Sequence, residues 1–413
     1  MAWITPFLYF SIYCGLVATT FYLSSYLDHR KKIRASFSEK ELPFVSVIIP
    51  AFNEESSIIR TIESILKSEY PRDRFEVIVV DDGSTDATHV RARTFLNRGV
   101  RVFTKQNGGK GTALNFGIAR AQGEIIFTMD ADTSVDPSSV RKMVQPFTNP
   151  RVMGVTPAML IEHPRTFLER IQFIEYYLGV FLRRAFSTLH AVYITPGAFS
   201  CYRKAFFEKH GGYDEHNITE DIEISLRIQS KGYFIDNCPD APAYTIPPRT
   251  FRGLLIQRRR WYFGYMRNLV AYRTLVFNKH YGDLGMFIMP IGILSIFFSL
   301  LVMVYLFTHG LSTLYDELSL FILNDYTFRT LSFDQYFLER LFYQISTNFI
   351  FISLFFFIGL SLAYLLWATR HVPTRESVFF NLLLFFFFFA PLYGFWWVVS
   401  VGYFLFARTV RWR

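Results

Sequence analysis

Four long apolar runs constrain this chain more than any other feature of its sequence. Each run is long enough to cross, as a helix, a hydrocarbon core of about 30 Å. The composition agrees, because 51% of the 413 residues are hydrophobic and only 19% are charged. The runs cover approximately Trp3 to Leu27, Met286 to Phe307, Phe349 to Trp367 and Val378 to Phe406. We therefore expect an integral membrane protein with four α-helical spans and a polar central region between the first span and the others.

The first apolar run is predicted to be a retained anchor, because it has neither the basic start nor the small-residue cleavage site of a signal peptide. Arg30, Lys31 and Lys32 follow this run, and the basic stretch 258–260 precedes the second run. Lys and Arg near the ends of spans favour the cytoplasmic side. We therefore expect this chain to be a multi-pass protein of the cell membrane, with its central region in the cytoplasm.

The last apolar run conflicts with this orientation. A simple crossing would place Arg408, Arg411 and Arg413 outside, against the usual bias of basic residues. The length of the run and Pro391 near its middle allow a tilted, kinked or partly interfacial helix instead.

The positive charge of the chain favours phosphate and anionic lipid as partners. The formal net charge is +9, but the basic residues gather beside the apolar runs, and no basic and aromatic pattern typical of RNA binding is present. Cys14, Cys201 and Cys238 have no paired spacing, which is typical of a reducing cytosol rather than of a disulfide framework or a structural zinc site. We expect no nucleic-acid partner.

The central region alternates between predicted strands and helices. Its helices include Ser56 to Lys67. The predicted strands are Phe44 to Ile49, Phe75 to Val80, Val100 to Thr104 and Glu124 to Met129. This alternation predicts a Rossmann-like α/β fold with a mainly parallel sheet covered by helices on both faces.

Two acidic motifs follow strands of this predicted sheet. Asp81 and Asp82 follow the second strand, and Asp130 and Asp132 follow the fourth. Ligands of such sheets bind beyond the carboxyl ends of the strands, where clustered carboxylates would repel an anionic ligand unless a divalent cation lies between them. Each motif by itself is also typical of an ordinary turn. Their order favours a site for Mg²⁺ or Mn²⁺ with a diphosphate.

Three further segments carry candidate site residues. A glycine-rich loop contains Lys110 but does not have the spacing of a P-loop, so Lys110 is expected to contact the base or phosphates of the ligand. A tight loop around Gly197 is expected to contact an acceptor. Glu220 and Asp221 lie at a predicted helix start, where acidic residues are favoured electrostatically in any case. Asp221 is our candidate for a general base that deprotonates an acceptor hydroxyl.

The segment 257–261 has a specific geometry. Gln257, Arg260 and Trp261 are spaced i, i+3 and i+4, so they lie on one helix face and present an amide, a guanidinium and an indole together. The alternative is an interfacial helix anchored by its Arg and Trp side chains. Arg258 and Arg259 are expected to point elsewhere and to contact phospholipid.

The ordered motifs Asp-Asp-Gly-Ser, Asp-x-Asp, Thr-Glu-Asp and Gln-x-x-Arg-Trp resemble those of the processive family-2 glycosyltransferases, which include cellulose, chitin, hyaluronan and poly-N-acetylglucosamine synthases. The resemblance covers roughly Phe44 to Arg273 and is closest to the poly-N-acetylglucosamine synthases over Gly108 to Ile118. It implies a GT-A fold, inversion at the anomeric carbon, a UDP-sugar donor such as UDP-N-acetylglucosamine, and Mg²⁺ or Mn²⁺.

The resemblance also implies roles for individual residues. Asp132 and Asp130 would hold the metal and donor, Asp221 would be the base, and Gly197 and Glu220 would contact the acceptor. The residues that would contact the nucleotide sugar are Pro50, Asn53, Glu54, Asp81, Asp82, Lys110, Asp130, Gln257, Arg260 and Trp261. Trp261 would also contact the acceptor.

Together these features divide the chain into four expected parts. Residues 1–28 form an anchor helix, 29–250 a cytosolic GT-A domain, 251–282 an amphipathic interface helix, and 283–413 a region with about three spans. So few spans would form only a narrow channel, and a second copy of the chain or a small accessory subunit is a candidate partner.

Two alternatives to a polysaccharide synthase remain at this point. A polyprenyl-phosphate glycosyltransferase, which moves one sugar onto a lipid, shares the early acidic motifs but normally lacks Gln-x-x-Arg-Trp. The second alternative is a non-catalytic transporter or scaffold. Charged residues within the apolar runs would favour it, but such residues are nearly absent there.

Overall fold

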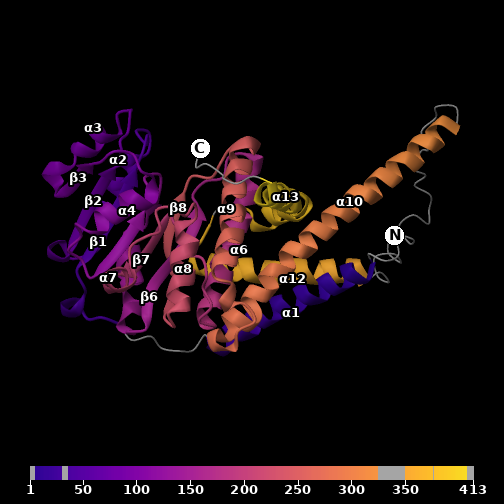
Figure 1. The fold of residues 1–413 in the computed structure, drawn as a ribbon, viewed down its shortest axis with the longest axis horizontal. Helices are drawn as coiled ribbons and strands as arrows, with labels where there is room; N and C mark the ends of the chain where they lie inside the picture. Colours follow the sequence, from indigo (N-terminus) through magenta and orange to yellow (C-terminus); the bar gives the residue numbers. More distant parts are fainter. Residues whose placement is uncertain (1–4, 30–35, 324–348, 375, 407–413) are drawn as a thin grey trace.

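A computed structural model describes residues 5–29, 36–323, 349–374 and 376–406 of the protein. A sheet with short helices forms one end of the molecule, and long apolar helices form the other (Figure 1). Two helices, α6 (Phe167–Thr188) and α9 (Phe251–Ala271), lie between these two parts. The basic residues expected to set the orientation at both chain ends, Arg30, Lys31, Lys32, Arg408, Arg411 and Arg413, lie outside the described residues.

The sheet of the described residues has eight strands in the order β3-β2-β1-β4-β7-β6-β8-β5. The four strands predicted from the sequence form its parallel half, β3-β2-β1-β4, whereas β7 runs antiparallel to both β4 and β6. The strands are β1 Val45–Ala51, β2 Phe75–Asp81, β3 Val100–Thr104, β4 Ile125–Met129, β5 Ser134–Val135, β6 Val152–Ile161, β7 Phe199–Arg203 and β8 Phe234–Thr245. The sheet is therefore mixed, with a parallel half that places the ends of β1, β2 and β4 at one edge.

Strand β1 extends beyond the predicted end at Ile49 and includes Pro50. The carbonyl of Ala51 accepts a hydrogen bond from the backbone N–H of Asp82 at 2.8 Å, so Ala51 faces β2 and Pro50 faces the other side. Pairing with β4 on that side ends at Ile48. Proline is tolerated in this strand because no partner there needs its missing N–H.

Helices cover both faces of the sheet, as predicted. Those of the sheet part, besides α6 and α9, are α2 Ile58–Leu66, α3 Thr88–Arg93, α4 Lys110–Ile118, α5 Ser139–Val144, α7 Lys204–His210 and α8 Glu220–Ser230. The interface helix α6 begins with a capping box, in which Thr166 accepts from the backbone N–H of Glu169 and the Glu169 carboxylate accepts from that of Thr166.

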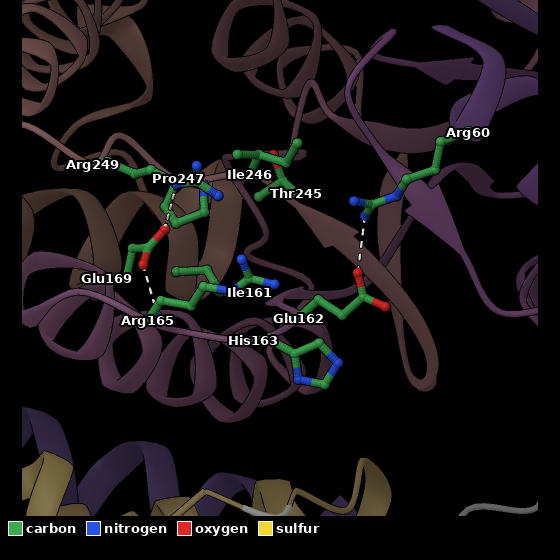
Figure 2. Close-up of a pocket in the computed structure, with 10 residues that line it drawn as sticks. All are labelled: Arg60, Ile161, Glu162, His163, Arg165, Glu169, Thr245, Ile246, Pro247 and Arg249. Carbon is green, nitrogen blue, oxygen red and sulfur yellow. Dashed lines mark hydrogen bonds and ion pairs between the residues drawn. The ribbon is translucent and has the colours of Figure 1, made fainter. Parts of the chain in front are cut away.

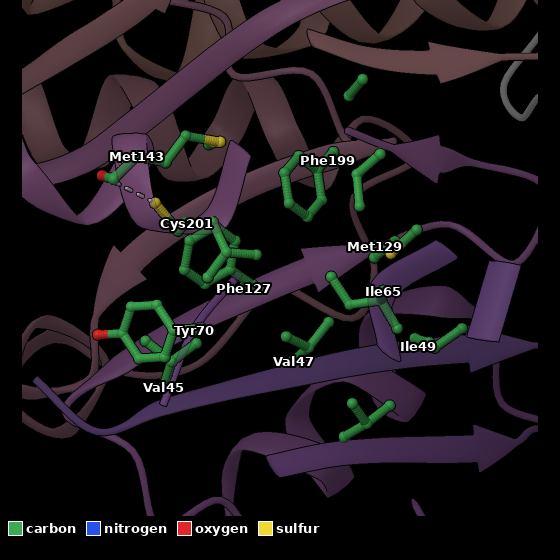
Figure 3. Close-up of a cluster of buried hydrophobic side chains, with 14 of the residues drawn as sticks. Val45, Val47, Ile49, Ile65, Tyr70, Phe127, Met129, Met143, Phe199 and Cys201 are labelled. Atoms are coloured by element: carbon green, nitrogen blue, oxygen red, sulfur yellow. Dashed lines mark hydrogen bonds between the residues drawn. The ribbon is translucent and has the colours of Figure 1, made fainter. Parts of the chain in front are cut away.

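The core confirms burial on both sheet faces. Val45, Val47 and Ile49 of β1 belong to one cluster, together with the rings of Phe127 and Phe199, whose centroids are 5.3 Å apart (Figure 3). The intervening residues of β1 face a second cluster on the opposite side, which includes Ile48. Alternate side chains thus enter different cores, as expected for a parallel sheet with two covered faces.

The apolar runs are helical where the structure describes them. They form α1 Thr5–His29, α10 Met289–Leu323, α12 Phe349–His371 and α13 Val378–Phe406. By length and composition, two stretches of the described residues could cross a membrane, 9–28 and 284–320, and the bent pair within α13 makes a third if it counts as one span. This is fewer than the four spans expected. The two halves of α13 meet at 42° beside Pro391, so the helix is kinked, which is one of the three forms expected for this run.

Helix α6 is in contact with α1, α12 and α13 as well as with β6 and β8. It therefore joins the sheet to the apolar helices. The four-part division of the chain stays a prediction.

Replacement of Phe127 by Ala should destabilise the sheet by about 3–5 kcal/mol, because Phe127 is fully buried and leaves a cavity against Phe199. The measurement is hydrogen exchange of the β1 and β4 amides in the full chain. Val90→Ala is the control, since Val90 is 68% exposed and its loss should change the free energy of opening by less than about 0.5 kcal/mol. Equal effects of the two substitutions would contradict this assignment of the core.

Candidate active site

The two aspartates at the end of β2 hold loops in place. Asp81 is 2% exposed and accepts from the backbone N–H of Ser84 at 3.1 Å. Asp82 is 3% exposed and accepts from Lys105 Nζ at 2.6 Å and from the backbone N–H of Gly109 at 2.8 Å. The Asp82 carboxylate thus fixes the glycine-rich loop against the strand end. Contact of these two residues with a nucleotide stays a prediction.

The loop after β1 is joined to the loop after β2. Asn53 has a left-handed backbone with φ 54°, and its Oδ1 accepts from the backbone N–H of Thr85 at 2.8 Å. The backbone N–H of Glu54 donates to Thr88 Oγ1 at 2.7 Å. Pro50, Asn53 and Glu54 therefore line the same edge as Asp82, as the sequence predicts for neighbouring strand ends.

Lys110 brings together motifs that are far apart in the sequence. Its Nζ lies 2.7 Å from Asp130 Oδ1, 3.1 Å from Glu220 Oε1 and 3.2 Å from the carbonyl oxygen of Gly197. Burial alone would lower the pKa of Lys110, but the carboxylates of Asp130 and Glu220 outweigh it and raise this pKa well above its usual range. Lys110 is thus a fixed cation at the centre of the site, with three protein partners that the sequence did not predict.

Asp221 has the setting of a general base. Its Oδ2 accepts from the backbone N–H of Gly197 at 3.2 Å, and its Oδ1 accepts from that of Ile222 at 2.9 Å. Burial and the neighbouring charge of Glu220 raise the pKa of Asp221 to about 6, against the opposing effect of Lys110 and Arg260. A carboxylate with this pKa is ionised near neutral pH and is a better proton acceptor than an ordinary aspartate.

The environment of Asp132 fits a divalent cation. Burial, followed by the negative charges of Asp130 and Glu54, raises the pKa of Asp132 to about 7. A bound Mg²⁺ or Mn²⁺ would relieve this repulsion and takes oxygen ligands of this kind. No group of three His, Cys, Asp or Glu side chains within the described ranges is arranged to hold a metal ion. The protein would supply few ligands, Asp132 first, and the remainder would come from diphosphate and water.

Helix α9 carries the segment 257–261, and Thr250 caps its start by accepting from the backbone N–H of Gly253. Arg260 is close enough for its charge to lower the pKa of Asp221. Gln257 and Trp261 lie on the same face of this helix by their spacing. The structure thus places this face of α9 beside the candidate base.

The prediction that Arg258 contacts phospholipid is wrong. Arg258 is 1% exposed, and its two terminal nitrogens lie 2.5 and 2.6 Å from the carboxylate oxygens of Glu175 on α6. Its guanidinium also lies over the rings of Trp261 and Trp396, at 4.5 and 5.4 Å from their centroids. Arg259 lies 4.6 Å over the ring of Tyr403 on α13. Local sequence could not show that α6 and α13 cover this side of α9.

Comparison with known proteins identifies the central region. Residues 46–211 match the family described as "Glycosyl transferase family 2". The chain contains a family 2 glycosyltransferase domain. The sequence-based prediction of this family is confirmed, and the reaction itself is considered below.

Two curated relatives resemble this chain. The chain is 34% identical to the probable glycosyltransferase YdaM of Bacillus subtilis over 234 residues, covering 54% of this chain and 56% of that protein. It is 30% identical to a poly-beta-1,6-N-acetyl-D-glucosamine synthase of Staphylococcus aureus over 261 residues, covering 62% and 63%. The chain thus spans less than two thirds of the length of these relatives.

One solved structure shares the fold over nearly the whole chain. It is the mannosyltransferase PcManGT from Pyrobaculum calidifontis in complex with GDP-Man and Mn²⁺, with a TM-score of 0.60 at 17% identity, covering 97% of this chain and 99% of that one. The predicted Rossmann-like GT-A fold of the glycosyltransferase is confirmed.

A separate pocket of about 140 Å³ lies between the loops that follow β6 and β8 (Figure 2). Two ion pairs cross its lining, Arg60 with Glu162 and Arg249 with Glu169, both at 3.0 Å. None of the predicted site residues lines it. The candidate site of the glycosyltransferase is therefore defined by the strand ends and by α9, rather than by this pocket.

Sequence reasoning missed several residues of the site. Lys105 binds Asp82, Glu175 pairs with Arg258, and Trp396 covers that arginine from α13. Lys105 follows β3, so its place at the strand-end edge was a usable signal. The other two contacts depend on helix packing that no local pattern encodes.

Replacement of Asp132 by Asn should weaken Mn²⁺ binding in the presence of UDP by about tenfold or more, since the substitution removes a charged ligand. The measurement is isothermal titration of Mn²⁺ into the protein in lipid, after removal of metal with a chelator. Asp240→Asn is the control, because the side chain of Asp240 is 60% exposed. Undiminished Mn²⁺ affinity in the Asp132 variant would exclude Asp132 as a ligand.

Proposed function

We propose that this protein transfers a sugar from a UDP-sugar, such as UDP-N-acetylglucosamine, to a growing polysaccharide at a cell membrane. The observation that carries the proposal is the position of Asp221, held by Gly197 and flanked by Glu220, Lys110 and Arg260. Gly197 and Lys110 belong to the segment that matches family 2, residues 46–211. The similarity to a poly-beta-1,6-N-acetyl-D-glucosamine synthase supports a polymer product and N-acetylglucosamine as the sugar. The apolar helices that contact α6 support a membrane setting.

The proposed reaction is a single displacement. Asp221 accepts the proton of an acceptor hydroxyl, whose oxygen forms a bond to the anomeric carbon while the bond from that carbon to the diphosphate breaks. The sugar inverts, UDP leaves, and Asp221 returns its proton to water. Gly197 holds the base through its backbone N–H, and Glu220 together with burial keeps the Asp221 pKa raised.

Charges around the base would stabilise the leaving diphosphate. Arg260 is a guanidinium near Asp221 and can form paired hydrogen bonds with phosphate oxygens. Asp132, supported by Asp130, would hold a Mg²⁺ or Mn²⁺ ion, which when bound neutralises diphosphate charge. The GDP-Man and Mn²⁺ in the related mannosyltransferase structure support a nucleotide sugar with a divalent metal here.

Trp261 is proposed to contact the acceptor sugar. An indole offers a flat apolar face on which a sugar ring can stack. Arg258 lies over this ring and is itself held by Glu175, so the orientation of Trp261 is set by contacts outside the site. Export of the product along the apolar helices is part of the proposal.

Replacement of Asp221 by Asn should lower turnover by about 10²- to 10⁴-fold, because the amide cannot accept the proton. The measurement is UDP release by the protein in lipid with Mn²⁺, scanning UDP-sugars, with the product sized. Asp73→Asn, at a side chain that is 80% exposed, should leave turnover unchanged.

The size of the product distinguishes a polysaccharide synthase from a polyprenyl-phosphate glycosyltransferase. A ladder or long polymer made from one donor supports the synthase. A single sugar on lipid would replace it with the polyprenyl-phosphate reaction. Turnover that survives the Asp221 substitution would remove this residue as the base.

The turnover number should rise with pH through about 6 and then level, because Asp221 acts only when deprotonated and its pKa is raised to about 6. Lys110→Met should move this rise to higher pH, since the lysine charge lowers the Asp221 pKa. The pH dependence of single-turnover rates tests both points. A rise centred near pH 4 in the wild type would contradict the assigned environment.

A further inference from the structure

One partly buried guanidinium near the candidate site, that of Arg183, has no acidic partner among the described residues. Nε and Nη2 of Arg183, on α6, are buried and have no hydrogen-bond partner in the part of the chain that the structure describes. Burial lowers the pKa of Arg183 to about 10, against the opposing effect of Tyr176. A buried cation without an anion is costly, and such groups in proteins are normally paired.

The backbone directs Arg183 back along its helix. A Cβ added at Gly179 would lie 3.2 Å from Arg183 Nη1 and 3.5 Å from Nη2, so the guanidinium lies over the bare backbone of Gly179. Tyr176, Gly179 and Arg183 are spaced i, i+3 and i+7 and share one face of α6. The glycine therefore allows the guanidinium to approach Tyr176.

Tyr176 connects this guanidinium to the candidate active site. Burial raises the pKa of Tyr176 to about 12, and the charges of Arg258, Glu175, Arg183 and Asp132 all act on it. Tyr176 is therefore close enough to both Arg183 and the proposed metal ligand for their charges to act on it. Tyr176 and Ala198 pack against the same buried core cluster, and Ala198 is the chain neighbour of Gly197.

The helix that carries Arg183 also packs against the apolar helices. Phe181 and Ala185 of α6 are in one buried cluster with Tyr22 of α1. The rings of Phe181 and Tyr364 of α12 stack at 4.0 Å. Helix α6, which carries Arg183, is thus in contact with the helices that would meet the membrane.

Comparison with Arg258 shows what is missing. Both guanidiniums lie near Tyr176, and Arg258 is fully buried whereas Arg183 is partly buried. Arg258 has the carboxylate of Glu175 as a bidentate partner, and Arg183 has no acidic partner among the described residues. A neutral sugar could supply hydrogen bonds but no negative charge. A phosphate group would supply both, in the geometry that guanidinium prefers.

We propose that Arg183 binds a phosphate group of a substrate beside Tyr176, near the candidate active site. This inference rests on the proposed sugar transfer for its substrate, and the phosphate has two candidate sources, the diphosphate of the donor or the phosphate of a lipid acceptor. The shared chemistry is a phosphate oxyanion placed beside Tyr176, next to the site of Asp132.

The test is direct binding to the full chain in lipid nanodiscs, without turnover. Two probes are titrated separately, UDP with Mn²⁺ and farnesyl phosphate, with farnesol to measure the contribution of the tail. Arg183→Gln should weaken binding of one phosphate probe by about tenfold or more, since a charge-assisted hydrogen-bonded contact is lost. Gly179→Val should have a similar effect, because its side chain would displace the guanidinium without changing the charge.

Arg170→Gln is the matched control. It removes the same charge from the same helix, but Arg170 already has Glu376 as a partner at 3.5 Å. Its affinity for both probes should equal that of the wild type. The thermal midpoint of Arg183→Gln without ligand should equal or exceed that of the wild type, because the substitution breaks no ion pair.

Each outcome decides the proposal. A loss confined to farnesyl phosphate, with farnesol unchanged, supports a lipid phosphate site, and a loss confined to UDP supports the donor diphosphate. Unchanged affinity of Arg183→Gln for both probes overturns the proposal, as does an equal loss in Arg170→Gln. Failure of sugar transfer in the wild type, with the Arg183-dependent binding intact, would remove the proposed function and leave this site.

Discussion

The candidate site depends on the positive charge of Lys110. This side chain lies at the start of α4 and holds Asp130 at the end of β4, Glu220 at the start of α8 and the carbonyl of Gly197 before β7. Without a cation, these acidic groups would repel one another in a buried setting. Lys110 therefore converts four separate loops into one arrangement, and the position of Asp221 follows from it.

The site nevertheless keeps an excess of negative charge at its edges. The pKa values of Asp132 and Asp221 are both raised, first by burial and then by a neighbouring carboxylate, Asp130 and Glu220 respectively. The negative charge around Asp132 and that around Asp221 favour different proposed roles. At Asp132 the repulsion favours a divalent cation, whereas at Asp221 it favours proton uptake. The charge of Lys110 lowers the pKa of both aspartates, so one lysine acts on both proposed functions.

A second charged contact joins this site to the apolar helices. Arg258 is held by Glu175 of α6 and covered by Trp396 of α13, while it supports Trp261 on its own helix. An acceptor on Trp261 would therefore lie on a residue whose position depends on α6 and α13. Arg183 is the counterpart on α6 that lacks an acidic partner in the described chain, and this difference separates a structural guanidinium from one left for a ligand.

Much of this architecture was determined by local sequence. Periodicity predicted the four parallel strands, because a short apolar run bounded by turn residues can be recognised as a buried strand from the local sequence alone. The acidic motifs were correctly expected at one edge, since parallel strands end on the same side. The end of β1 was predicted too early, because proline is excluded from a strand only where a partner needs its N–H, and that depends on where β4 stops.

Only the tertiary structure decided which charges neutralise one another. Lys110 was expected to face the ligand and is held by Asp130 and Glu220, and Arg258 was expected at lipid and is buried against Glu175. The strand β7, which runs antiparallel between β4 and β6, was also not predicted from the sequence pattern. A motif specifies which side chains share a strand end or a helix face. The partner of a charge is set by packing between elements distant in the sequence, and local periodicity contains no information about it.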